Sequence, residues 1–155
     1  CLTILHQSYR NGGVMCEFED VEEYLPDSVR EIVAVIGLPA TEKFVKAFGG
    51  FSFQFSKSAK YFDKLREVLG QEDAVKLQSY MQVGEVYIPR CETALRILRN
   101  QQLYADFCHL TETEKLSGRM AIMRLCQKYQ ICDRTAWEVV RYYQRYRAVA
   151  QSVLF

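Results

Sequence analysis

Residues 122–146, IMRLCQKYQICDRTAWEVVRYYQRY, contain two successive helix patterns. In each pattern, apolar residues recur at the i, i+3, i+4, i+7 spacing that gives a helix one buried face. The first set is Ile122, Leu125, Cys126 and Tyr129, and the second is Ala136, Val139, Val140 and Tyr143. Only Gln130-Ile131-Cys132 separates them. Because so short a connection makes two helices cross steeply, the stretch predicts a helix-turn-helix, a motif that places its second helix in a DNA major groove.

The charge of the chain is unevenly distributed. From Lys115 onward there are eight lysines and arginines against two acidic residues, Asp133 and Glu138. The preceding 114 residues contain twelve basic and seventeen acidic residues. The net charge of +1 is therefore the sum of −5 on an acidic body and +6 on a basic C-terminal module. This asymmetry favours a nucleic-acid partner.

Composition excludes several other classes of protein. A hydrophobic content of 49% is typical of a folded globular protein, and no apolar run approaches the roughly 18 residues of a membrane span. The six cysteines contain no C-x₂-C pair, and only two histidines accompany them, so we expect reduced thiols, no metal site and no cofactor. We find no convergent set of catalytic groups and expect no enzyme. A cytoplasmic location follows from the reduced thiols.

An internal repeat with an offset of 33 residues organises the acidic body. Val35-Ile36-Gly37 corresponds to Val68-Leu69-Gly70, and Phe53 corresponds to Val86. The pattern of each copy predicts a helix followed by a strand. The predicted helices run over 40–48, ended by Gly49-Gly50, and over 72–81, and the predicted strands are 51–55 and 85–88. We interpret the repeat as a paired helix–strand unit that forms a small sheet, within one chain or between two.

Three further helix features complete the expected organisation. Ser28 and Glu31 have capping-box spacing at the start of a helix that reaches Ile36, and Thr111 and Glu114 repeat that spacing. A long helix is expected from about 91 to 108.

The predicted fold class is α+β, mainly α, with a small antiparallel sheet. The predicted domains are a segment of unclear structure (1–24), a helix–strand domain (25–110) and a helix-turn-helix domain (111–155).

Residues 25–147 resemble the Mor family of transcription activators, named for the middle operon regulator of phage Mu. The resemblance rests on Ile36-Gly37 before a helix that ends in Phe48-Gly49-Gly50, on Val86-Tyr87-Ile88-Pro89-Arg90, and on the basic helix-turn-helix at 119–147. It implies a DNA-binding homodimer held together by the helix–strand domain, with a helix-turn-helix on each subunit. It also implies activation of promoters by recruitment of host RNA polymerase, and a phage or prophage origin in a bacterial cytoplasm.

Three positions depart from the pattern of the family. Gln130 stands where a turn glycine is usual, Cys132 where serine is expected, and Cys126 where a small residue such as alanine is common. If Gln130 has a positive φ, the strain costs about 1 kcal/mol.

The outward face of the predicted recognition helix supplies the candidate site. The base-contact candidates are Arg134, Trp137, Glu138 and Arg141. The candidates for the DNA backbone are Arg119, Arg124, Lys128, Thr135, Arg145 and Arg90. Arg134 can bridge guanine O6 and N7, and Glu138 can accept from cytosine N4. The alternatives are a surface ion pair between Arg134 and Glu138, and a packing role for Trp137.

Two further alternatives remain open from the sequence. The segment Tyr87-Ile88-Pro89-Arg90 is either an edge strand or a contact to the DNA backbone or minor groove through Arg90. The helix-turn-helix can also be a scaffold in a protein-interaction module. In that case a partner-binding tail would consist of the acidic residues Glu17, Glu19, Asp20, Glu22 and Glu23.

Overall fold

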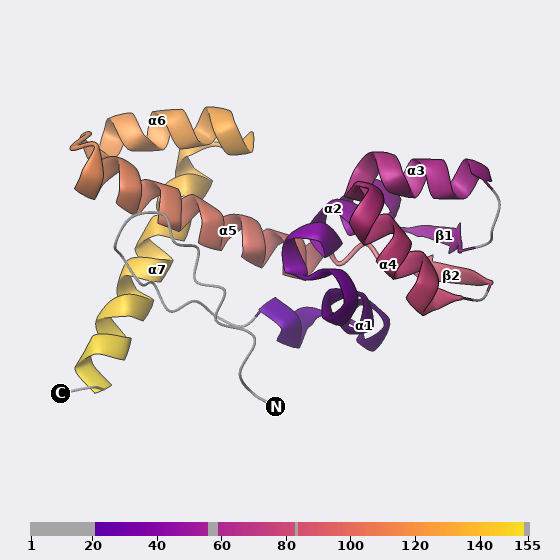
Figure 1. Cartoon of the computed structure of the whole chain (residues 1–155). Helices are drawn as coiled ribbons and strands as arrows, with labels where there is room; N and C mark the ends of the chain where they lie inside the picture. The colour runs from indigo at the N-terminus through magenta and orange to yellow at the C-terminus, as the bar shows by residue number, and fades with distance from the viewer. Residues whose placement is uncertain (1–20, 56–58, 83, 154–155) are drawn as a thin grey trace. The chain divides into compact units, whose positions relative to one another are not determined.

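A computed structural model describes residues 21–55, 59–82 and 84–153 of the chain. These residues form seven α-helices and a two-stranded antiparallel sheet, so the fold is α+β and mainly α, as predicted (Figure 1). They divide into two compact units, 21–96 and 97–153, and the boundary lies inside helix α5 (Glu92–Cys108). No helix in these ranges is long and apolar enough to cross a membrane.

The first unit contains two copies of a helix–helix–strand arrangement. The first copy is α1 (Asp27–Ile36), α2 (Leu38–Phe48) and β1 (Phe51–Gln54), and the second is α3 (Ala59–Leu69), α4 (Gln71–Met81) and β2 (Glu85–Ile88). The predicted helices before each strand and both predicted strands are confirmed. Helix α3 was not predicted from the sequence, although Phe62, Leu65 and Leu69 are spaced to form one helical face.

A glycine joins the two helices of each copy. Gly37 has φ 82° and ψ 164°, and Gly70 has φ 84° and ψ 169°. This backbone conformation is essentially restricted to glycine, because a Cβ atom would clash with the main chain. The matching angles show that the sequence repeat is also a repeat of backbone structure.

The two copies are related by an approximate two-fold axis through the paired residues Phe53 and Val86. These residues match in the repeat and also face each other in the sheet, where Phe51 pairs with Ile88. On the other side of the axis, the Phe55 N–H donates to Gly84 O at 3.0 Å. The helix contacts have the same symmetry, because α1 lies against α4 and α2 against α3. The strands of the repeat therefore pair within one chain.

The core of this unit also follows the repeat. Ile32 and its match Leu65 are buried, as are Phe44 and its match Leu77. On the first copy, Phe44 contacts the rings of Phe48 and Phe53 at centroid distances of 5.3 and 5.7 Å. Burial of large apolar side chains, each contributing about 1.5–3 kcal/mol, is what joins the two copies.

Both predicted capping boxes are wrong. Helix α1 begins at Asp27, so Ser28 lies inside the helix, and Pro26 precedes it without a side-chain cap. Thr111 lies in a π-helical turn, His109–Thr113, which continues from α5, and its Oγ1 donates to Phe107 O at 2.8 Å. The next helix, α6 (Gly118–Tyr129), is capped by Ser117, whose Oγ accepts from the Met120 N–H.

Candidate nucleic-acid interface

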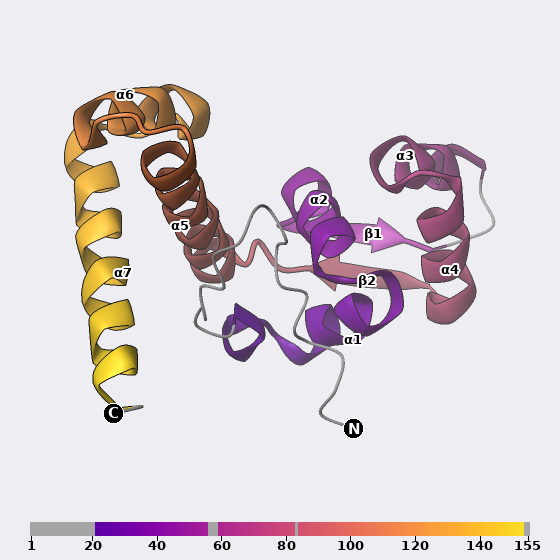
Figure 2. The ribbon, with the colours of Figure 1, turned by 60° about the vertical axis from the view of Figure 1, so that its left-hand side comes forward.

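The second unit contains the two helices that the sequence patterns predicted. Helix α6 ends at Tyr129 and helix α7 (Asp133–Val153) begins after only residues 130–132. The two helices cross steeply in both views of the ribbon (Figure 2). Gln130 has φ 54° and ψ 47°, and its N–H donates to Cys126 O. The expected left-handed conformation at this non-glycine residue is therefore present, together with its strain.

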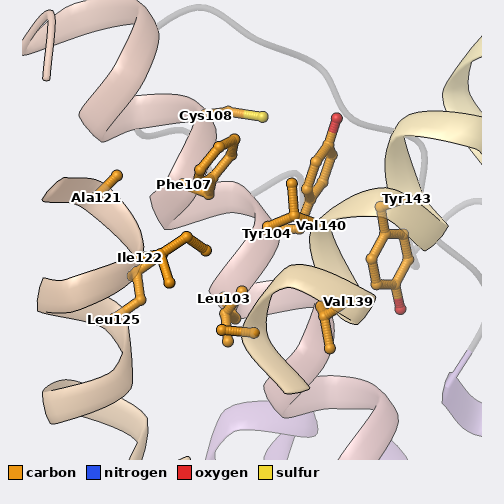
Figure 3. Packing of buried hydrophobic residues seen from close by; sticks show 11 residues of the cluster. Leu103, Tyr104, Phe107, Cys108, Ala121, Ile122, Leu125, Val139, Val140 and Tyr143 are labelled. Carbon is orange, nitrogen blue, oxygen red and sulfur yellow. The ribbon is translucent and has the colours of Figure 1, made fainter. Parts of the chain in front are cut away.

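A compact apolar core joins α5, α6 and α7, and its inward-pointing side chains are drawn in Figure 3. Both predicted apolar faces contribute to it. Its buried members are Leu103, Tyr104, Phe107, Cys108, Ala121, Ile122, Leu125, Ala136, Val139, Val140 and Tyr143. Because this side of α7 is buried, the opposite side must face solvent.

The exposed side of α7 is strongly basic. Arg134, Glu138, Arg141 and Arg145 are exposed and follow one another at helical spacing. Arg134 Nε donates to Glu138 Oε1 at 3.2 Å, so these two side chains form the surface ion pair that the sequence left as an alternative. Such an exposed pair contributes only about 0.3–0.5 kcal/mol, so a nucleic-acid contact can replace it.

Trp137 lies at the edge of the core. Its ring meets the Phe107 ring edge-on at a centroid distance of 6.2 Å, and an added Cβ on Gly118 would come within 3.3 Å of it. The Arg141 guanidinium lies 6.0 Å from the Trp137 ring centroid, in cation–π contact. Packing thus holds Trp137, and Trp137 in turn positions Arg141.

An acidic residue near the end of α5 and another just after the π-helical turn hold several of the basic side chains. Asp106 Oδ2 accepts from Lys128 Nζ and, at 2.7 Å, from Tyr129 Oη. Arg124 lies 3.3 Å from Glu114. These pairings were not predicted from the sequence, because both acids precede Lys115, the start of the basic C-terminal stretch. Residues 97–155 contain nine basic and five acidic residues, so the surplus of this unit is +4.

The remaining backbone candidates lie at three places. Arg119 is exposed in the first turn of α6. Arg145 Nε donates to Arg141 O at 3.3 Å. Thr135 Oγ1 lies 3.2 Å from the sulfur of Cys132. All three belong to the same unit as the exposed side of α7.

Arg90 belongs to the other compact unit. Its side chain lies over Gly50, where an added Cβ would come within 2.7 Å of Arg90 Nε. Its Nη1 is 3.9 Å from Glu92 Oε1. The strand expected for this segment is present, since β2 pairs with β1 along its whole length, and Arg90 follows the end of β2. A contact of Arg90 with DNA stays a prediction.

Cys132 is an exposed thiol immediately before α7. Hydrogen bonds from the Thr135 side chain and backbone N–H lower the pKa of Cys132. The nearby Cys126 is partly buried, and this burial raises its pKa. Within the described ranges, no cluster of three or more histidine, cysteine or acidic side chains has the arrangement of a metal site.

Comparison with known proteins identifies a family but no individual relative. Neither the curated proteins nor the solved structures contain a match to the chain. The family model described as the Mor transcription activator family matches residues 42–153, which extend from α2 to the end of α7. The chain therefore belongs to the Mor transcription activator family.

Proposed function

We propose that the chain is a sequence-specific DNA-binding activator in which α6 and α7 are the helix-turn-helix. One observation carries this proposal. Arg134, Arg141 and Arg145 are exposed on the side of α7 opposite its buried side, and a three-residue connection fixes α7 against α6. Membership of a transcription activator family supports the same conclusion.

The Arg134–Glu138 ion pair would open on binding. Arg134, in the first turn of α7, would donate two hydrogen bonds to a guanine edge, and Glu138 would accept from a cytosine amino group. One bidentate contact of this kind discriminates between bases by about 1–3 kcal/mol, more than the exposed ion pair contributes. Arg119, Arg141 and Arg145 would contact phosphates, while Trp137 holds α7 in position.

Two copies of the chain would bind together, because one recognition helix reads only a few base pairs and half-sites are spaced by about one helical turn. As an activator, the bound dimer would recruit RNA polymerase. Its site of action would be the cytoplasm of a bacterium that carries the phage or prophage.

The test is fluorescence anisotropy with a labelled 30-base-pair duplex of mixed sequence, titrated over a series of salt concentrations. We expect affinity to fall steeply with salt, because bound arginines displace counterions from the DNA. In the double variant Arg134→Ala/Arg141→Ala, we expect weaker binding and a salt slope smaller by about two.

The matched control is Lys43→Ala/Lys64→Ala, which removes the same charge from exposed positions of the other unit. It should bind as the wild type does. Equal loss in both double variants would mean that total charge, and not the α7 face, determines binding. Absence of binding at low salt would overturn the proposal and favour a protein-interaction module.

A further inference from the structure

The core of the second unit ends in a hollow between α5 and the C-terminal half of α7. The volume of this hollow is about 260 Å³. The side of α7 that is buried at Val140 and Tyr143 continues further along the helix with Arg147, Ala148 and Gln151, which line the hollow. Because these side chains are polar or small, they leave open the space that large apolar side chains would fill in a continuous core. The sequence of α7 therefore creates the hollow.

The floor of the hollow is apolar and well supported. It consists of Tyr104, Phe107 and Cys108 of α5, which are only 4%, 7% and 6% exposed. The Tyr104 ring stacks on the Tyr143 ring at a centroid distance of 5.4 Å, which fixes its position. Figure 3 shows the Tyr104 hydroxyl and the Cys108 sulfur at the same end of the core. Such a floor can hold the apolar part of a small ligand.

Two opposite charges stand at the rim of the hollow. Arg147 Nη1 lies 3.7 Å from Glu112 Oε1, and the two side chains are 39% and 48% exposed. This distance exceeds the about 2.7–2.9 Å of a charged hydrogen bond. Half-exposed pairs of this kind contribute little to stability. A ligand can therefore separate Arg147 from Glu112 without destabilising the unit.

The Tyr104 hydroxyl provides a neutral polar group beside Arg147. Burial, followed by the influence of Cys108, raises the pKa of Tyr104 to about 12, while a hydrogen bond with Arg147 acts in the opposite direction. The hydroxyl is therefore protonated at neutral pH and can donate a hydrogen bond. The Arg147 guanidinium and the Tyr104 hydroxyl are thus two donors close to one another, an arrangement that suits a carboxylate.

We propose that this hollow binds a small zwitterion the size of an apolar amino acid. Its carboxylate accepts from Arg147 and from the Tyr104 hydroxyl, its ammonium group lies against Glu112, and its apolar side chain lies on Phe107. The inference goes beyond the proposed function, since none of these four residues is among the proposed DNA contacts.

Charge complementarity favours a zwitterion over a simple ion. An anion without an ammonium group would bring its negative charge next to Glu112, and a cation without a carboxylate would bring its positive charge next to Arg147. A molecule that carries both groups on one carbon atom gives each side chain a partner of opposite charge. The volume of the hollow lies below the about 300–1,000 Å³ of sites for drug-sized ligands, so the ligand must be smaller than those.

The local backbone also distinguishes this place. Glu112 belongs to the π-helical turn His109–Thr113, in which the Glu114 N–H donates to His109 O at 3.2 Å. Thr111, another lining residue, is held in this turn because its Oγ1 donates to Phe107 O at 2.8 Å. Single π-helical turns within helices occur frequently at functional sites. The turn at the end of α5 thus presents Glu112 to Arg147 of α7.

Titration of the full chain, followed by the shifts of its backbone amides in nuclear magnetic resonance spectra, tests the inference without DNA. The probes are L-leucine, L-methionine, L-phenylalanine and L-tryptophan. We expect at least one of them to bind with a dissociation constant below about 1 mM. The shift changes should lie mainly in residues 104–112 and 144–151. If no probe gives saturable shifts up to about 10 mM, or if the shifts lie elsewhere, the inference is wrong.

Analogues of the bound probe separate its two charged groups. The N-acetyl derivative lacks the ammonium group, and the primary amide lacks the carboxylate. Each should bind about tenfold more weakly than the parent amino acid. Equal binding of all three molecules would mean that the hollow recognises only the apolar side chain, which would overturn the assignment of a zwitterion.

Substitutions assign each charge to its partner. Arg147→Gln should weaken binding of the amino acid and remove its advantage over the amide. Glu112→Gln should remove its advantage over the N-acetyl derivative. Lys115→Gln is the control, because it removes a charge from an exposed residue of the same unit that does not line the hollow. If Arg147→Gln folds and keeps the full preference for the carboxylate, Arg147 is not the group that binds it, and the inference is wrong.

A further variant tests the hollow itself. Ala148→Leu adds a larger side chain at a lining position, and we expect it to abolish binding of every probe. Ser152→Leu introduces the same side chain at an exposed position outside the lining and should bind as the wild type does. Unchanged binding in Ala148→Leu would place the ligand elsewhere and overturn the inference. Since none of these measurements contains DNA, failure of the proposed function would leave their outcome unaffected.

Discussion

Gln130 holds the turn between α6 and α7 in a conformation that glycine adopts more easily. Its φ of 54° places the Cβ atom close to the following carbonyl, and its side-chain Nε2 donates to Gln127 O at 2.7 Å in an exposed position. Gln130→Gly should therefore increase the free energy of unfolding of this unit by about 1 kcal/mol. Urea unfolding measures it through the fluorescence of Trp137, the single tryptophan.

Gln130→Ala is the control for this substitution, because it removes the amide while keeping the Cβ atom. It should be no more stable than the wild type. If the alanine and glycine variants have equal stability, backbone strain at this position is not what limits the turn.

Cys132 should be the most reactive thiol among Cys91, Cys108, Cys126 and Cys132. Its pKa lies below the ordinary value of 9.0 because Thr135 stabilises the thiolate, whereas burial raises the pKa of Cys91 and Cys126. A lowered pKa means more thiolate at neutral pH and faster alkylation. Peptide mapping after brief treatment with iodoacetamide, at pH values from 6 to 10, gives the rate of each thiol.

The rate at Cys132 should reach its half-maximum below pH 9.0, and Thr135→Val should move that midpoint upward. A midpoint at or above 9.0 in the wild type would contradict the assignment of the hydrogen bond. The sequence alone did not predict this difference in pKa between the thiols. The difference depends on how exposed each thiol is, and on Thr135, which comes within reach of Cys132 only once α7 has formed.

At the scale of single elements, Ser117 determines where α6 begins. Its Oγ accepts from the Met120 N–H at 3.3 Å, which satisfies one of the free donors of the first turn. Ser117→Ala should lower the free energy of unfolding by about 1 kcal/mol, measured by urea unfolding with Trp137 fluorescence. Ser117→Asp should retain stability, and a loss of similar size in that variant would show that the cap is not responsible.

The buried faces of α6 and α7 were predicted from the sequence. A helix that buries one side needs apolar residues at the i, i+3, i+4, i+7 spacing, and this pattern is visible within a short stretch of sequence. Helix starts were predicted less well. The spacing at Thr111 and Glu114 is that of a capping box, but α5 continues into the π-helical turn and occupies those residues. The partners of Lys128 and Arg124 were also not predicted, since Asp106 and Glu114 approach them only through tertiary packing.

At the scale of the whole molecule, the repeat accounts for the folding of residues 21–96, and the helices proposed to contact DNA, α6 and α7, belong to the other unit. The sequence offset of 33 residues predicted the two strands, but not how they pair, since pairing within one chain or between two chains satisfies the same pattern. The register through Phe53 and Val86 resolves this choice in favour of one chain. Each unit has its own core, so the stability of one need not depend on the other.

Leu77 and Leu125 allow this independence to be measured. Both are essentially completely buried, Leu77 in the repeat and Leu125 in the core of α5, α6 and α7. Truncation of a buried leucine to alanine costs about 3 kcal/mol. Leu77→Ala should therefore lower the urea midpoint of the helical circular dichroism signal from the first unit, while the midpoint of Trp137 fluorescence stays unchanged. Leu125→Ala should shift the fluorescence midpoint. If Leu77→Ala moves both midpoints together, the two units unfold as one cooperative structure, and the stability of residues 97–153 depends on the repeat.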